Sequence, residues 1–191
     1  SYGHFASLAY TRPNSTPPNA PSVVHLGDSG LNVTTKSGTT WTSQPIGRDG
    51  GEFYGWMEHA SLVYKNDGNP AVCYRRAYQN KKNPGGLVVA QRTSAGVWSK
   101  KLVDSGGDAG AYNSMVLAPD GNLAVAYTYV SGSSTKVKFA KSSSGSNWTI
   151  ETVADSGLSA TLAYDPVTGR PSVVTRDSTD VIFLSKNTAG T

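Results

Sequence analysis

The chain has 191 residues, of which only 16% are charged, and its formal net charge is +4. This length suits one domain, or a piece of one, with a substantial core. The basic residues are spread along the chain instead of forming one run, which argues against specific nucleic-acid binding. No apolar stretch approaches the roughly 20 residues of a membrane-spanning helix. The single cysteine, Cys73, excludes an intrachain disulfide.

The composition favours an all-β protein. The chain contains 21 glycines, 10 prolines and 10 tyrosines, together with many serines and threonines. Turn-forming and β-branched residues of this kind are typical of short strands joined by tight turns. Short apolar runs recur along the whole length, which argues against disorder.

Four copies of one strand pattern follow one another along the chain. The first copy has expected strands at 7–10, 21–25 and 31–34, and its fourth strand opens with Trp41. A proline-rich loop at 12–21 separates its first two strands. The second copy has strands at 61–64, 70–74 and 87–90, and its fourth strand opens with Trp98. Here the Asp-Gly turn at 66–69 predicts a tight hairpin between the first two strands.

The third and fourth copies repeat this order. The third has strands at 114–117, 123–127, 137–140 and 148–153, the last of which opens with Trp148. The fourth has strands at 161–164, 171–175 and 181–184. Where its tryptophan strand should begin, the sequence reads Thr-Ala-Gly-Thr at 188–191.

Four short antiparallel strands in each repeat of about 50 residues are typical of a β-propeller blade. We therefore predict an all-β protein, a β-propeller of about four blades at 5–46, 59–103, 113–153 and 160–191, the last of them incomplete. A β-sandwich is the alternative. Trp41, Trp98 and Trp148 share one repeat position, so we expect structural roles for them, with each indole buried between blades. We also expect that the chain does not close a propeller alone, and that a second copy, another subunit or the rest of the polypeptide covers its end blades.

The turn before each tryptophan resembles a degenerate Asp-box, or BNR-like repeat, of the sialidase type. That motif reads Ser/Thr-x-Asp-x-Gly-x-Thr-Trp between the third and fourth strands of a blade. In the first copy Thr34, Gly38, Thr40 and Trp41 are in register with it, but Lys36 stands at the aspartate position. No copy keeps the aspartate. The resemblance implies a propeller fold, in which these turns lie away from the catalytic face.

Catalysis in sialidases uses an arginine triad that clamps a carboxylate, with a Tyr/Glu pair and an aspartate. This chain has Arg75, Arg76 and Arg176 near the ends of second strands. It lacks the family's Arg-Ile-Pro segment near the start, so no catalytic residue is carried over from the family.

The candidate ligand-binding residues lie in two links between copies and, for Arg75, Arg76, Arg176 and Asp177, at or just after the ends of second strands. In a propeller, the link from an outer strand to the next inner strand lies on the face where ligands usually bind. The segments 48–59 and 104–113, with Tyr2, His4 and Phe5, should share this rim. The candidates are Glu52, Tyr54, Trp56, Glu58, His59, Arg75, Arg76, Asp108, Tyr112, Arg176 and Asp177. The alternative is that these loops pack over the channel and their acids are solvated.

The histidines lack the spacing of metal ligands and no nucleotide-binding motif occurs, so we expect neither metal nor cofactor. The leading interpretation is a non-catalytic extracellular, cell-surface or virion-surface module that binds glycan or protein through its loop face. A part of a sialidase-like or other glycan-cleaving enzyme is one alternative. A structural assembly subunit is the other.

Overall fold

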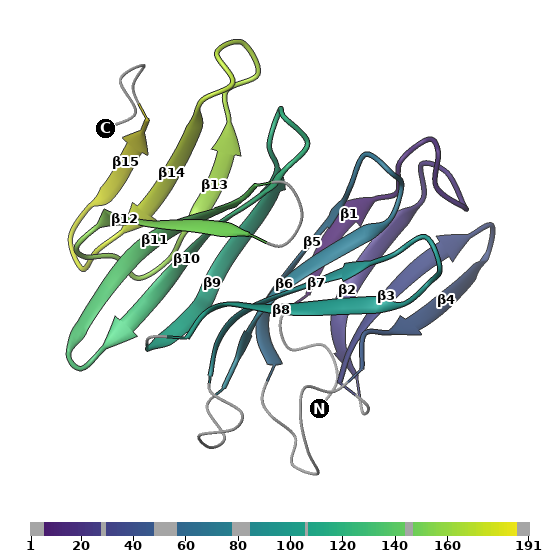
Figure 1. Ribbon diagram of the computed structural model, residues 1–191, viewed down its shortest axis with the longest axis horizontal. Helices are drawn as coiled ribbons and strands as arrows, with labels where there is room; N and C mark the ends of the chain where they lie inside the picture. Colours follow the sequence, from purple (N-terminus) through teal and green to yellow (C-terminus); the bar gives the residue numbers. More distant parts are fainter. Residues whose placement is uncertain are drawn as a thin grey trace.

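The computed structural model describes residues 6–27, 30–47, 57–77, 85–105, 107–143 and 147–186. These residues form fifteen strands in four separate sheets (Figure 1). No helix in the described part of the chain has the length and apolar character needed to cross a bilayer. The described residues form strands, turns and bends and contain no helix, so this part of the protein is all-β.

Each sheet is an antiparallel meander whose strands follow the order of the chain. The first sheet contains β1 (Ser7–Tyr10), β2 (Pro21–Gly27), β3 (Gly30–Ser37) and β4 (Thr40–Pro45). The second contains β5 (Met57–Tyr64), β6 (Pro70–Arg76), β7 (Gly86–Arg92) and β8 (Trp98–Asp104). The third contains β9 (Asp108–Leu117), β10 (Leu123–Ser131), β11 (Ser134–Ser142) and β12 (Trp148–Ala154), and the fourth β13 (Thr161–Tyr164), β14 (Pro171–Arg176) and β15 (Val181–Ser185).

The number and order of these sheets fit the four sequence repeats. The sheets follow one another through the molecule, with the first and fourth at opposite ends (Figure 1). The described sheets therefore form an open series.

An apolar cluster lies between each sheet and the next. Between the first two sheets, Val24 and Leu31 pack with Leu62 and Tyr64. Corresponding clusters join the second sheet to the third and the third to the fourth. The central strands of the middle sheets are covered on both faces, and for this reason successive residues of β6 and β10 are apolar without alternation.

A repeated hydrogen bond also joins the first strands of neighbouring sheets. In each case a serine hydroxyl accepts from the backbone N–H of a residue in the next sheet. The three bonds run from Leu62 N to Ser7 Oγ (3.3 Å), from Met115 N to Ser61 Oγ (3.0 Å) and from Leu162 N to Ser114 Oγ (3.2 Å). This repeated contact explains why a serine opens the strand pattern in the first three copies.

The proline-rich loop of the first copy packs against the second sheet. Asn14 Nδ2 donates to the carbonyl of Asn66 (3.0 Å), and Ser15 Oγ donates to the carbonyl of Gly68 (2.9 Å). Gly68 itself has a φ of 79°, which suits the tight turn predicted there. The loop and the turn therefore hold the first two sheets together at this end.

The three tryptophans do not share one environment. Trp98 is partly buried against the cluster between the first and second sheets, and Trp148 against the cluster between the second and third. Trp41 is 49% exposed, so the expectation that it is buried between blades is wrong for this residue. The reason is that Trp41 lies on the face of the first sheet that points away from the second, where no described sheet covers it.

This difference predicts unequal effects of Trp→Ala substitutions on stability. Trp98→Ala should lower the free energy of unfolding by about 2–3 kcal/mol, because packed apolar area is lost. Trp41→Ala should cost less than about 1 kcal/mol, since most of its indole already faces solvent. Urea unfolding followed by circular dichroism measures both values. Equal losses would contradict the assignment of Trp98 to the core.

Two predicted boundaries between repeats need correction. The third copy was expected to begin its first strand near residue 114, with 104–113 as a link, but β9 already begins at Asp108. Similarly, β5 begins at Met57, inside the link predicted at 48–59. Both strands contain register shifts, and Gly110 has a φ of 100°, so the chain kinks while it remains paired. A kinked strand of this kind carries no apolar alternation by which the sequence could reveal it.

Candidate functional site

The candidate site lies where β5 and β9 begin and β6 ends. Antiparallel pairing places the start of β5 beside the end of β6, and contacts between the second and third sheets bring the start of β9 to the same end (Figure 1). Arg75, near the end of β6, forms a two-pronged ion pair with Asp108 at the start of β9. Nε donates to Oδ1 at 2.6 Å and Nη2 donates to Oδ2 at 2.7 Å. This pair joins the second sheet to the third, and the Asp108 carboxylate remains half-exposed.

An aromatic pair lies on the same two strands, β5 and β9. The rings of His59 and Tyr112 have their centroids 4.3 Å apart and are inclined at 49°. Both residues have positive φ, 50° and 44°, which costs free energy for residues of this size. They occupy the same repeat position, two residues before the serines of the inter-sheet hydrogen bond. Tyr112 is 55% exposed, so the pair is accessible to a ligand.

Asn113 holds this strained segment in place. Its side-chain amide donates to the carbonyls of His59 and of Gly110, the latter at 2.7 Å. Its amide oxygen accepts from the thiol of Cys73 at 2.9 Å. Cys73 is buried, and burial raises the pKa of its thiol well above the ordinary range. The thiol is therefore a packed donor and not a nucleophile.

Glycine allows β9 to pass close to Arg75. A Cβ added to Gly110 would lie 3.0 Å from Cα of Leu87 and 3.3 Å from Cα of Arg75. No larger residue fits between these backbones without movement. The glycine thus brings Asp108 and Tyr112, on either side of it, against the end of β6.

A buried ion pair beside this site was missed by the sequence reasoning. Lys138 Nζ lies 2.9 Å from Asp104 Oδ2, which also accepts from the hydroxyl of Tyr127 at 2.8 Å. The same ammonium group lies 3.4 Å from the centroid of the Tyr129 ring. Burial, and then the Asp104 charge, raise the pKa of Tyr127. A lysine between apolar residues at 137–140 was the available sequence signal.

The remaining candidates are dispersed or lie outside the described part. Arg76 ends β6, where it pairs in register with Met57 and Gly86. Arg176 ends β14 in the fourth sheet, followed by Asp177. Glu52, Tyr54 and Trp56 lie outside the described residues, as do Tyr2, His4, Phe5 and the side chain of Glu58.

Asp177 stabilises its own turn. Its Oδ1 accepts hydrogen bonds from the backbone N–H groups of Thr179 and Asp180, both at 2.8 Å. These bonds lower the pKa of the carboxyl group. Within the described residues, no group of three histidine, cysteine or acidic side chains is placed to hold a metal ion.

Comparisons with known proteins give structural matches only. No protein-family model and no curated protein matches the chain. A solved protein of unknown function from Dyadobacter fermentans superposes over 99% of this chain with a TM-score of 0.71 and 15% identity. A fructan 1-exohydrolase from Cichorium intybus (TM-score 0.55, 11% identity) and an endo-1,4-beta-xylanase from Bacteroides thetaiotaomicron (0.53, 12%) each superpose over 97%.

The chain is shorter than each of these structures. It spans 66% of the Dyadobacter protein, 41% of the exohydrolase and 72% of the xylanase. Identities this low show a shared fold. The fold of this chain is thus one that also occurs in enzymes acting on glycans.

Proposed function

We propose that the four sheets are consecutive blades of a β-propeller and that the chain binds glycan at the end where β5 and β9 begin. The four meanders, each packed face to face on the next, support the propeller arrangement. The likeness to two glycan-degrading enzymes supports glycan as the ligand class.

The observation that carries this proposal is the aromatic pair beside the Arg75–Asp108 ion pair. An exposed aromatic ring offers an apolar face on which the C–H groups of a sugar ring stack. In this site the exposed ring is that of Tyr112, which packs against the ring of His59. The guanidinium and carboxylate groups offer donors and acceptors for sugar hydroxyls. Apolar area with a few fixed polar groups is typical of small-molecule sites.

Binding without catalysis fits the described carboxylates better than hydrolysis does. Glycoside hydrolysis needs two carboxyl groups facing the scissile bond, one of them free to protonate the leaving group. Asp108 is paired with Arg75, and Asp104 is buried against Lys138. A glycan-cleaving enzyme is the second candidate, because two of the structural neighbours are such enzymes. The extracellular location and the kinship with Asp-box repeats are further parts of the proposal.

Replacing the exposed ring should weaken glycan binding. Tyr112→Asn removes the stacking surface, while asparagine tolerates the positive φ at this position. We expect a loss of about tenfold or more in affinity, the effect of about 1.4 kcal/mol. Affinity electrophoresis and calorimetry with inulin-type fructan and with xylan measure it. Tyr10→Asn is the matched control, because Tyr10 is similarly exposed but is the last residue of β1, whereas His59 and Tyr112 lie near the starts of β5 and β9.

Two outcomes would count against this proposal. If Tyr10→Asn weakens binding as much as Tyr112→Asn, the ligand does not use the aromatic pair. Release of reducing sugar from either polysaccharide by the wild-type chain would favour the enzyme instead.

A further inference from the structure

The fourth sheet has an open edge at β15 in the described part of the chain. Lys186 N donates to the carbonyl of Pro171, so the backbone groups of this residue point toward β14. Antiparallel pairing alternates along a strand, and therefore the N–H groups of Val181, Phe183 and Ser185 point outward. Phe183 is 66% exposed. An edge with a row of outward N–H groups is a template for a further strand.

The other three sheets show what occupies this edge. The repeat has a four-residue segment in each third strand, at 31–34, 87–90 and 137–140 in these sheets and at 181–184 in the fourth. In each of the three complete sheets, the residue two positions after this segment pairs in register with the tryptophan that opens the fourth strand. The pairs are Lys36 with Trp41, Arg92 with Trp98 and Ser142 with Trp148. The residue at the same position in the fourth sheet is Lys186. A strand that pairs with β15 in this register would place its first side chain beside Lys186.

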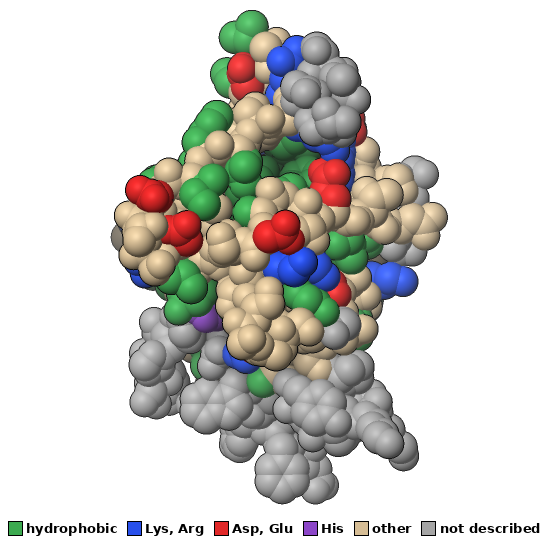
Figure 2. Space-filling view, turned by 90° about the vertical axis from the view of Figure 1, so that its left-hand side faces the viewer, with side chains coloured by type: hydrophobic (Ala, Val, Ile, Leu, Met, Phe, Trp, Pro, Cys, Tyr) green, Lys and Arg blue, Asp and Glu red, His purple; other side chains and the backbone are tan. Residues whose placement is uncertain are grey.

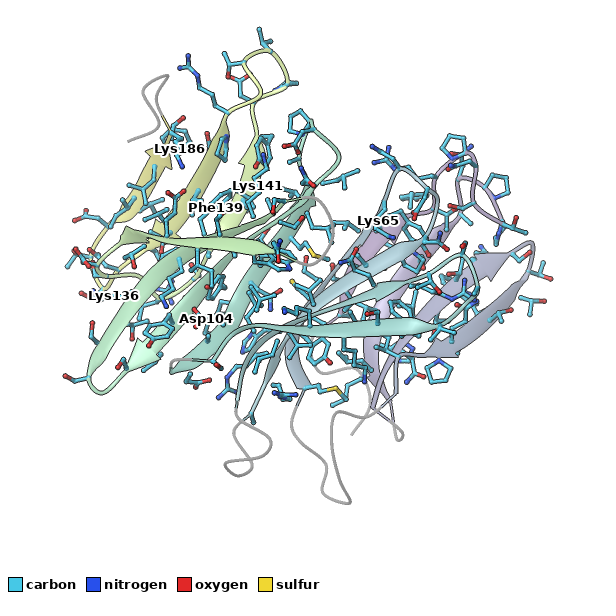
Figure 3. All side chains as sticks on the ribbon, in the orientation of Figure 1. Lys65, Asp104, Lys136, Phe139, Lys141 and Lys186 are labelled. Carbon is cyan, nitrogen blue, oxygen red and sulfur yellow. The ribbon has the colours of Figure 1, made fainter. Side chains whose placement is uncertain are left out.

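A pocket of about 400 Å³ opens at that point, between β12 and β15. Phe139, Val173 and Leu184 line this pocket. The residues at the same repeat positions in the earlier sheets belong to the apolar clusters against which Trp98 and Trp148 pack. Hydrophobic side chains surround a hollow on this side of the molecule (Figure 2). Phe139 and Lys186 come from neighbouring sheets and lie near each other beside the pocket (Figure 3).

We propose that β15 and this pocket bind an extended peptide strand that opens with tryptophan. The indole would fill the pocket against Phe139 and Val173, and the strand's carbonyls would accept from the outward N–H groups of β15. Lys186 forms an ion pair with Glu151 at 2.8 Å at the side of the pocket. The bound strand would thus be recognised through one aromatic side chain, which fills the pocket, and through its backbone carbonyl groups, which pair with β15. This contact repeats the one that Trp148 makes with the cluster between the second and third sheets.

A synthetic peptide tests the proposal directly. The peptide has the sequence of residues 147–154, Asn-Trp-Thr-Ile-Glu-Thr-Val-Ala, and is added to the full chain. We expect slower hydrogen–deuterium exchange at the amides of Val181, Phe183 and Ser185, which would donate to the added strand. Fluorescence anisotropy of the labelled peptide gives its affinity. The same peptide with alanine for tryptophan should bind about tenfold more weakly, because the indole supplies the buried apolar area.

Two substitutions of Ser185 in β15 show whether the peptide binds through backbone hydrogen bonds to this strand. Ser185→Pro removes one outward N–H group but leaves the bonds to β14, and proline is tolerated at such an edge. It should weaken peptide binding about tenfold, whereas Ser185→Ala keeps the N–H group and should bind as the wild type does. Circular dichroism verifies that both variants fold. Equal binding of the tryptophan and alanine peptides, or unchanged exchange at β15 with saturating peptide, would overturn the proposal.

Discussion

Replacing Gly86 by alanine is expected to lower the free energy of unfolding by more than about 3 kcal/mol, or to prevent folding. Gly86 opens β7 with a φ of 142°, a conformation that side chains rarely adopt. An added Cβ would also lie 2.0 Å from the carbonyl oxygen of Asp104, which is backbone and cannot rotate away. The end of β8 would have to separate from β7.

The matched control for this experiment is Gly38→Ala. Gly38 also has a positive φ, 58°, but an added Cβ would have no neighbour within 4 Å. Its cost should be about 1 kcal/mol, from the backbone conformation alone. Urea unfolding of both variants separates the two contributions. Similar losses would mean that β7 and β8 move apart easily at Asp104.

Removing the Asp104 carboxylate is expected to cost about 3–5 kcal/mol. Asp104 is buried and accepts from Lys138 and from the hydroxyl of Tyr127 (its position is labelled in Figure 3). In Asp104→Ala both donors lose their partner, and a largely buried ammonium group is left uncompensated. Denaturant unfolding measures the loss.

Two further variants show whether burial of the charge is the cause. Asp155→Ala breaks the ion pair of Lys136, but Asp155 is 88% exposed, so the cost should stay below about 0.5 kcal/mol. The double variant Asp104→Ala/Lys138→Met should recover much of the loss, because no buried charge remains unpaired. If the double variant is as unstable as Asp104→Ala, packing and not charge explains the effect.

The candidate site could be predicted only in part. His59, Asp108 and Tyr112 are candidates because links before first strands carry ligands in propellers, and Arg75 is a candidate because it lies near the end of a second strand. Their pairing could not be predicted, since Arg75 and Asp108 are 33 residues apart and belong to different sheets. The pairing depends on Gly110, whose missing side chain lets β9 approach β6.

The sequence by itself determined the order of the strands and their grouping into four repeats, but not where β5 and β9 begin. Some residues repeat about every 50 positions because they have the same structural role in each copy, as the serines of the inter-sheet hydrogen bonds do. This pattern is visible in the sequence without a structure. Only the tertiary structure decided which repeated residues are covered. Trp41 and Trp98 have equivalent positions, yet Trp41 is exposed and Trp98 is packed, because only Trp98 lies on a face that another described sheet covers. Burial depends on the neighbouring sheet, and a residue's own repeat carries no information about that neighbour.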